Sequence, residues 1–596
     1  MARALPETYV NASKRVAITS LINRAASILS KKRLILLLLA LLLIYNINFR
    51  TIGSGDTTPA SLLPFNVLEY HSLTLDHFYS YYVSIGLTPY YIVNEKGVYV
   101  SMYPIVTPLL ITPFYLIPYE LLKLTGYPIN LVDPVFSLTV SWMEKLCASF
   151  IASLSAIFVY LSLRRIVDEK IVFICTIAYA LGTATFSISS QGLWQQGLSE
   201  LLLSIMIYVI IKNESTDDLI NIPLIGALSG LFFFNRPSDG ILLLPAIIYV
   251  LSLKNYKKIF LFLISAIAAS IPFFGYNYYY FRNIFGGYGS LLSIFAFNWG
   301  AASNFLGLLI SPNRGIFVYT PIALFSLAGL FCIKKINLPR LRTFLYVSAV
   351  AMFLQVLVYS CFTIWWAGYS YGPRFLAGML PLVVMFISLS LPGNIGFKAK
   401  DKRKVAISAA FISLLLISIS IQAIGVFYYK ADWDSFPVSI DAAPWRVWDF
   451  HDTQIGRSFS DGLCQMTFLN IFNPNSINII GSYGDEQWGS TTTQWLPNTS
   501  YIFYRSAIDH NVNLTFNALS FYEDRPMMIY LNGRPAYEQL INVSGSSVDV
   551  PLHVENGYNN ITIYAIGGGQ SPKDIPGSTS DDPRILSFAI QNIKIV

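Results

Sequence analysis

The sequence is poor in charged residues for its length. They make up 12% of 596 residues, whereas hydrophobic residues make up 54%. A soluble chain of this size carries about twice that charged fraction, so lipid is the expected solvent for most of the chain. The basic residues behind the formal net charge of +7 lie in short clusters between apolar runs, which argues against a nucleic-acid partner.

Cysteine is also scarce. Of the five cysteines only Cys464 falls in the polar C-terminal part, which excludes an internal disulfide there. The first 33 residues are too long and too polar for a cleaved signal peptide. The apolar run 34–49 is therefore expected to remain as the first membrane helix.

Apolar runs of near-membrane length follow one another up to about residue 430. They lie at 136–163, 171–189, 197–212, 218–235, 239–253, 258–278, 315–333, 343–363, 373–391 and 405–427. With the first helix they predict about eleven crossings, a polytopic α-helical membrane protein. The cluster Ser30-Lys31-Lys32-Arg33 places the N-terminus in the cytoplasm, and four of the five loops then expected inside are basic.

The segment 103–124 is apolar but contains Pro104, Pro108, Pro113 and Pro118. Counting it as a crossing would invert every later loop, so it is expected to lie at the outer membrane surface or to re-enter the membrane. The odd number of crossings then sends the C-terminal tail outside the cell.

From residue 430 the apolar runs shorten and alternate, as expected for an antiparallel β-sandwich. The predicted organisation is a cytoplasmic segment 1–33, a multi-pass domain 34–429 with a first outer loop 50–135, and an extracytoplasmic β-sandwich 430–596. The tail contains four Asn-x-Ser/Thr sequons, at Asn498, Asn513, Asn542 and Asn560. They fit an extracytoplasmic face, although an Asn-rich and Ser-rich tail also produces sequons by chance.

Asp56 lies a few residues beyond the first membrane helix. At the membrane boundary a carboxylate ionises without deep burial, so Asp56 is a candidate general base for a lipid-borne substrate. The alternative is that it caps a helix beginning at Thr57-Thr58-Pro59. The same outer loop contains further polar candidates without metal-ligand spacing: Glu69, His71, Asp76 and His77.

Four arginines are expected on the outer side, each next to a membrane end: Arg236, Arg282, Arg314 and Arg374. A guanidinium pairs with two phosphate oxygens, so this group suits a lipid phosphate; snorkelling to ordinary head groups is the alternative. Arg374 is the strongest candidate because aromatic residues precede it and Gly372-Pro373 fix the local backbone. Of these aromatics, Trp365, Trp366 and Tyr371 are candidate substrate contacts. The alternative is that they and Tyr369 form only an interfacial belt.

Several motifs, taken in order, resemble a known superfamily. They are SGDTTPASLLP (54–64), MYPIVTPLL (102–110), LWQQG (193–197), NRP (235–237), LLISPNRGIFVYTP (308–321) and WWAGYSYGPRFLAGMLP (365–381). Together they resemble the membrane glycosyltransferases of the GT-C superfamily, which includes protein O-mannosyltransferases, the lipid A aminoarabinose transferase and oligosaccharyltransferases.

The resemblance implies a sugar carried on polyprenyl or dolichyl phosphate and transferred, with inversion, to a hydroxyl of a surface glycan, lipid or protein outside the cell. It implies that Asp56 is the base. Two positions differ from similar proteins: Gln196 stands where a His is expected, and Asp56 is not part of an Asp-x-Asp pair. The resemblance therefore does not extend to an obligatory divalent metal. The tail resembles carbohydrate-binding sandwiches in architecture alone.

Two other functions fit many crossings. A transporter or flippase usually places ionisable residues at the membrane midplane and shows internal symmetry, whereas here the charges line the outer rim and no repeat is found. A non-catalytic surface glycan assembly protein would use the tail as its binding module. In that case Asp56 would be dispensable.

The proline-rich segment generates a topology prediction. If 103–124 does not cross the membrane, Glu95 and Asp133 share the outer face. Single cysteines at these two positions should react equally with a membrane-impermeant thiol reagent on intact cells. Protection of one position alone would show that the segment crosses.

Overall fold

The computed structural model describes residues 32–84, 88–216, 218–291, 300–392, 401–435, 438–460, 479, 481–488, 491–506, 509–555, 557–578, 580 and 582–595. Most of the predicted cytoplasmic segment 1–33, part of the basic loop 396–404 and Cys464 lie outside these residues. The chain divides into two compact units, 1–464 and 465–596.

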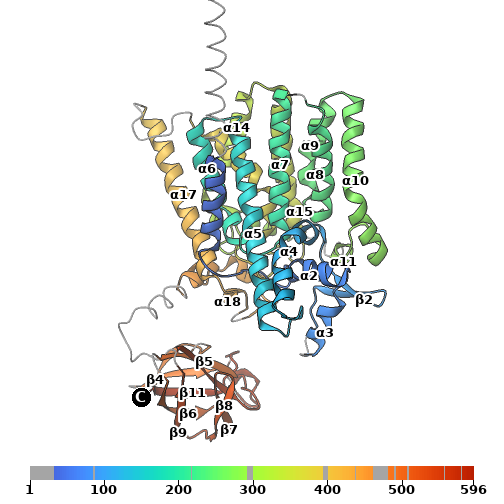
Figure 1. Cartoon of the computed structure of the whole chain (residues 1–596). Helices are drawn as coiled ribbons and strands as arrows, with labels where there is room; N and C mark the ends of the chain where they lie inside the picture. Colours follow the sequence, from blue (N-terminus) through green and yellow to red (C-terminus); the bar gives the residue numbers. More distant parts are fainter. Residues whose placement is uncertain are drawn as a thin grey trace, which may run out of the picture. The chain divides into compact units, whose positions relative to one another are not determined.

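The first unit is a bundle of helices (Figure 1). A first helix, described over 32–46, is followed by α2 (Thr58–Tyr70), α3 (Asp76–Ser84), the β1–β2 hairpin (Ile92–Glu95, Val98–Ser101), α4 (Val106–Leu124), α5 (Pro134–Leu163), α6 (Glu169–Gly182), the π-helix η1 (Thr185–Ser189), α7 (Gln195–Thr216), α8 (Asn221–Asn235), η2 (Pro237–Leu243), α9 (Leu244–Ser252) and α10 (Tyr256–Phe281). The second half contains α11 (Tyr288–Leu291), α12 (Ala301–Ile310), α13 (Ile316–Tyr319), η4 (Pro321–Ala323), α14 (Leu324–Cys332), η5 (Ile333–Lys335), α15 (Pro339–Ser360), η6 (Arg374–Met379), α16 (Leu380–Ser390), α17 (Lys402–Tyr428), α18 (Asp432–Ser435) and η7 (Pro444–Trp448).

Helices occupy every predicted apolar run, which confirms the membrane class of this unit. Among the described residues, five helices are long and apolar enough to cross a membrane: α5, α7, α10, α15 and α17. Helix α4, inside the segment 103–124, is not one of them. In Figure 1 it lies with α2, α3 and α11 at one end of the bundle. The count of about eleven crossings stays a prediction.

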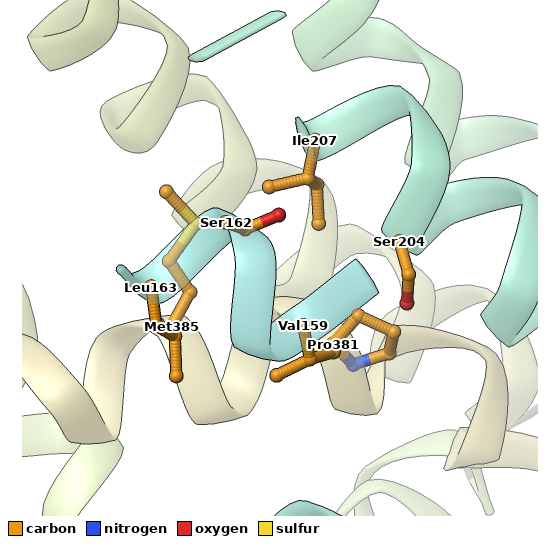
Figure 2. A pocket seen from close by; sticks show the side chains of 7 residues that line it. All are labelled: Val159, Ser162, Leu163, Ser204, Ile207, Pro381 and Met385. Carbon is orange, nitrogen blue, oxygen red and sulfur yellow. The ribbon is translucent and has the colours of Figure 1, made fainter. Parts of the chain in front are cut away.

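The bundle is tightly packed. Figure 2 shows a cavity between α5, α7 and α16, lined by Val159, Ser162, Leu163, Ser204, Ile207, Pro381 and Met385. Its volume of about 10 Å³ leaves room for about one water molecule. It is a packing defect between these helices and too small for a lipid-linked sugar.

The residues just after 430 belong to the first unit, although the composition changes there. Asp434 forms an ion pair with Arg314 at 2.6 Å, and both side chains are fully buried. The Gln454 carboxamide accepts a hydrogen bond from the Tyr319 hydroxyl at 2.9 Å. Buried polar contacts of this kind hold a polar segment against an apolar bundle, so the compact units divide at Cys464 rather than at Lys430.

The second unit is built from antiparallel strands. One sheet has the order β5-β10-β7-β8 and the other the order β3-β4-β11-β6-β9. The strands are β3 (Asp485–Trp488), β4 (Thr491–Leu496), β5 (Thr499–Ser506), β6 (His510–Ser520), β7 (Arg525–Leu531), β8 (Arg534–Ile541), β9 (Ser546–Val554), β10 (Gly557–Ala565) and β11 (Phe588–Ile595). Alternate residues of both sheets, such as Ile529 and Val550, share one buried apolar cluster, as the sequence alternation predicts.

Small residues allow α8 to approach α10 closely. Gly226 and Gly230 are four residues apart on α8, and an added Cβ atom would lie 2.3 Å from the Phe262 carbonyl oxygen and 2.4 Å from the Ala266 carbonyl oxygen, respectively. Backbone atoms cannot rotate away as side chains do. This spacing is the small-xxx-small pattern of closely packed membrane helices.

Substitution at this contact should destabilise the protein. We expect Gly230→Ala to lower the free energy of unfolding by roughly 1–3 kcal/mol, because the methyl group overpacks the helix contact. The measurement is thermal unfolding of the purified protein. The control is Gly275→Ala in α10, where an added Cβ meets nothing within 4 Å. Equal stability of the two variants would contradict the prediction.

Candidate functional site

A tight turn after the first helix presents Asp56. The Thr57 hydroxyl donates to the Ser54 carbonyl oxygen at 3.0 Å and accepts from the Ser54 N–H at 3.1 Å. Gly55 is required because a Cβ atom there would lie 2.6 Å from the ring of Tyr91. The turn thus fixes the backbone on both sides of Asp56.

The Asp56 carboxylate accepts three hydrogen bonds. Oδ1 accepts from the hydroxyls of Tyr90 at 2.7 Å and Tyr103 at 2.6 Å, and Oδ2 accepts from Nη1 of Arg374 at 2.6 Å. Burial alone raises the pKa of Asp56, but the Arg374 charge and these hydrogen bonds bring the pKa below its usual value. Asp56 is therefore ionised. The capping alternative is not realised, because Thr57 occupies the N-cap position of α2 and no side chain caps it.

Arg374 begins η6 and is 91% buried. Nη2 donates to the Ala367 carbonyl oxygen at 2.8 Å, and the guanidinium carbon lies 4.2 Å from the ring centre of Trp194. Nε is buried without a hydrogen-bond partner among the described residues. A buried donor without an acceptor lowers the stability of the fold by about 1–3 kcal/mol. A ligand with an acceptor at this position would remove that cost.

Arg236 forms a second ion pair beside the first. It lies 3.2 Å from Asp239 and donates to the Tyr359 hydroxyl from Nε at 3.1 Å and from Nη2 at 3.0 Å. When the Gln196 amide is oriented with its oxygen toward Arg236, Nη1 donates to it at 2.7 Å. Protein acceptors therefore engage all three guanidinium nitrogens of Arg236. Gln196, which replaces the expected His, serves here as an acceptor.

Phe375 joins the two arginines. Its ring centre lies 5.7 Å from the guanidinium carbon of Arg374 and 5.4 Å from that of Arg236. Tyr288 faces Tyr103 with ring centres 6.1 Å apart. The Asp56–Arg374 and Asp239–Arg236 ion pairs therefore both lie beside Phe375. Of the two carboxylates only Asp56 is partly exposed, with 20% of its side-chain surface accessible.

The other two predicted arginines are placed differently. Arg314 is fully buried, and it donates to the Trp366 and Gly368 carbonyl oxygens as well as to Asp434. These contacts give it a structural role in holding the segment after α17. Arg282 ends α10 in an exposed position, and its guanidinium carbon lies 5.5 Å from the Tyr278 ring centre.

The two other candidate carboxylates of the predicted first outer loop, Glu69 and Asp76, have local partners. Glu69 accepts from the Tyr119 hydroxyl at 2.8 Å and lies 3.7 Å from Lys123. Asp76 accepts from the Tyr99 N–H at 2.7 Å, at the start of α3. His71 is exposed at the C-cap of α2. The hydrogen bonds of the Asp56 carboxylate come from other residues, Tyr90, Tyr103 and Arg374. The described residues contain no group of three or more His, Cys, Asp or Glu side chains that could hold a metal ion.

The predicted aromatic contacts are buried. The Trp366 indole donates to Asp441 at 2.8 Å, and the Tyr371 hydroxyl donates to the Ile421 carbonyl oxygen at 2.8 Å. Trp365 packs against Gly307, where a Cβ atom would lie 2.2 Å from its ring. These three side chains shape the backbone turn before Arg374.

Sequence reasoning missed the aromatic partners of the ion pair. Tyr103 and Trp194 lie within two of the motifs named above, MYPIVTPLL and LWQQG, so the signal was present there. Tyr90, Tyr288 and Phe375 carry no such signal. With 38 tyrosines and 41 phenylalanines in the chain, composition does not single out any one of them.

No family model matches the chain, and no curated protein matches it. Among solved structures, ArnT from Cupriavidus metallidurans bound to undecaprenyl phosphate shares 11% identity, with 73% of this chain and 79% of that chain covered and a TM-score of 0.40. An Archaeoglobus fulgidus oligosaccharyltransferase in complex with Zn and sulfate shares 12% identity, with 74% and 57% covered and a TM-score of 0.38. A family 35 carbohydrate-binding module from Clostridium thermocellum shares 13% identity, with 20% and 97% covered and a TM-score of 0.14.

The lowered pKa of Asp56 sets the pH range of its contribution to stability. That contribution is fully present above the unfolded-state value of about 3.9 and is lost as the pH falls through the lower folded-state value. Asp56→Asn should lower stability by roughly 1–3 kcal/mol, evenly from pH 5 to pH 8. Thermal unfolding of parent and variant measures the difference. A difference that already shrinks between pH 7 and pH 5 would contradict the assigned direction.

Proposed function

We propose that the chain is a membrane glycosyltransferase that transfers a sugar from polyprenyl or dolichyl phosphate to an acceptor hydroxyl, with inversion, at the outer face of the membrane. The observation that carries this proposal is the contact between an ionised, partly exposed carboxylate and a buried arginine with an unpartnered N–H. Such a pair offers a base for the acceptor and positive charge for a departing phosphate.

The reaction needs few protein groups because a lipid phosphate is already a competent leaving group. Asp56 takes the proton of the acceptor hydroxyl, and the acceptor oxygen attacks the anomeric carbon on the face opposite the phosphate. The bond between that carbon and the phosphate oxygen breaks, and the lipid phosphate leaves. The charge on the departing phosphate is offset by Arg374, whose planar fork matches two phosphate oxygens.

Of the four predicted arginines we assign the donor phosphate to Arg374. Arg236 is held by Asp239 and Tyr359 and lies against the same Phe375 ring as Arg374. It adds positive charge to the site but has no guanidinium nitrogen without a protein acceptor. The C-terminal unit we assign to the outer side as a β-sandwich. Its predicted orientation follows from the odd number of crossings.

The central prediction is that Asp56→Asn abolishes transfer while the lipid-linked donor still binds. Asn is nearly isosteric but has no basic carboxylate, and a general base contributes about 10²–10⁴ in rate. We therefore expect turnover to fall at least ~10²-fold with no loss of donor affinity. The measurement is transfer from polyprenyl-phosphate sugar by the purified protein, without an ion gradient.

The matched control is Asp133→Asn. Asp133 lies on the same predicted outer side and caps α5 by accepting the Phe136 N–H at 2.9 Å, and Asn caps a helix equally well. This variant should turn over normally. Turnover by Asp56→Asn close to that of the parent would refute the base role even if the protein proves to be a glycosyltransferase, whereas gradient-dependent movement of lipid without transfer would favour a transporter.

A further inference from the structure

The two oxygens of the Asp56 carboxylate differ in their partners. Oδ1 is held by two hydroxyls, which come from the loop before β1 (Tyr90) and from the loop between β2 and α4 (Tyr103). Oδ2 accepts one hydrogen bond, from Nη1 of Arg374 at 2.6 Å. A carboxylate held in this way is fixed at one oxygen and can be released at the other.

Two of the three guanidinium nitrogens of Arg374 have partners in the protein, Nη1 and Nη2. Nη2 is bonded to the Ala367 carbonyl oxygen, and the Trp194 ring covers the face of the guanidinium. Nε is buried and has no hydrogen-bond partner among the described residues, so its N–H lacks an acceptor unless a ligand supplies one. An incoming phosphate oxygen that meets this N–H brings a negative charge to the same guanidinium that neutralises Asp56.

We propose that Arg374 is shared between Asp56 and the donor phosphate, and that Tyr90 and Tyr103 hold Oδ1 while Oδ2 is released to become the proton-accepting atom. The inference rests on the proposed function. It assigns Tyr90 and Tyr103 as positioning residues and makes Oδ2 a usable base only after the donor has bound.

The physical reason is the balance of charge around Asp56. Three groups face its carboxylate: the cation Arg374 and the neutral hydroxyls of Tyr90 and Tyr103. Two further titratable groups lie nearby: Tyr288, whose ring faces Tyr103, and Glu144, which lies against Gly53 in the turn. While Arg374 pairs with Asp56, the pKa of Asp56 is below its usual value and the carboxylate is a weak base. A phosphate on Arg374 weakens that pairing, so the pKa of Asp56 rises and proton transfer becomes more favourable.

The experiment follows the protonation of Asp56 directly. Infrared difference spectra of the purified full-length protein are recorded over a range of pH, with Asp56→Asn used to assign the Asp56 carboxyl band. Polyprenyl phosphate without a sugar is then added at saturation, so that no turnover occurs. We expect the titration of Asp56 to move to higher pH when this probe is bound.

Two variants of Arg374 test whether the phosphate acts on Asp56 through sharing of this arginine or only through its own nearby charge. In Arg374→Gln the titration should lie at higher pH from the start and should not move when polyprenyl phosphate is added. If that variant does not fold, Arg374→Lys keeps the charge without the planar fork and should show a smaller shift than the parent. Arg534→Gln, an exposed arginine of β8, should behave as the parent.

The tyrosines are tested by Tyr103→Phe. Loss of one hydrogen bond to the carboxylate should move the titration of Asp56 to higher pH in the free protein, and polyprenyl phosphate should still shift it further. Turnover should fall about 10-fold with donor affinity unchanged, because Oδ1 is held less firmly. The control is Tyr115→Phe, a buried tyrosine whose hydroxyl has no hydrogen-bond partner among the described residues.

Each outcome has one meaning. Binding of polyprenyl phosphate without any shift in the parent overturns the exchange and leaves the proposed transferase function intact. Equal titration of Tyr103→Phe and the parent overturns the positioning role of Tyr103. Failure of polyprenyl phosphate to bind removes the proposed donor site, and the exchange with it.

Discussion

The ion pair between Asp56 and Arg374 connects residues 318 positions apart in the chain. It brings the turn after the first helix to the start of η6. The turn rests on Glu144, which lies against Gly53 and accepts the Leu193 N–H at 3.2 Å. An ionised carboxylate and a buried guanidinium stabilise each other only at short distance, so the surrounding elements must be held accurately.

A buried carboxylate deeper in the bundle provides part of that support. Glu200, on α7, accepts hydrogen bonds from Tyr179 of α6 at 2.7 Å and from Thr185 of η1 at 2.7 Å. These bonds tie the π-helix to the two neighbouring helices, and π-helical turns are frequent at functional sites. The short segment between η1 and α7 contains Trp194, whose ring lies against the Arg374 guanidinium. The start of α7 contains Gln196, whose side-chain amide lies next to Arg236.

Much of the helical unit could be predicted because each apolar run carries its own signal. The positions of the apolar runs, and of Asp56 a few residues beyond the first run, can be read from short stretches of sequence. The role of Arg314 cannot: like the other three arginines it lies next to a predicted membrane end, and only its partner Asp434, 120 residues later, reveals a structural contact. For the same reason the change of composition at residue 430 did not mark the end of the compact unit, since burial of Asp434 is a tertiary event.

The division of labour between the arginines could not be obtained from residue type. Arg236 and Arg374 both lie next to predicted membrane ends, and both lie against Phe375. What separates them is hydrogen-bond saturation: protein acceptors engage every guanidinium nitrogen of Arg236, whereas Nε of Arg374 is left without one. A saturated guanidinium stabilises the fold, and an unsaturated one beside a partly exposed carboxylate retains the capacity to bind an anion. The chemistry of this site therefore depends on which buried hydrogen-bond donors are left without an acceptor in the protein.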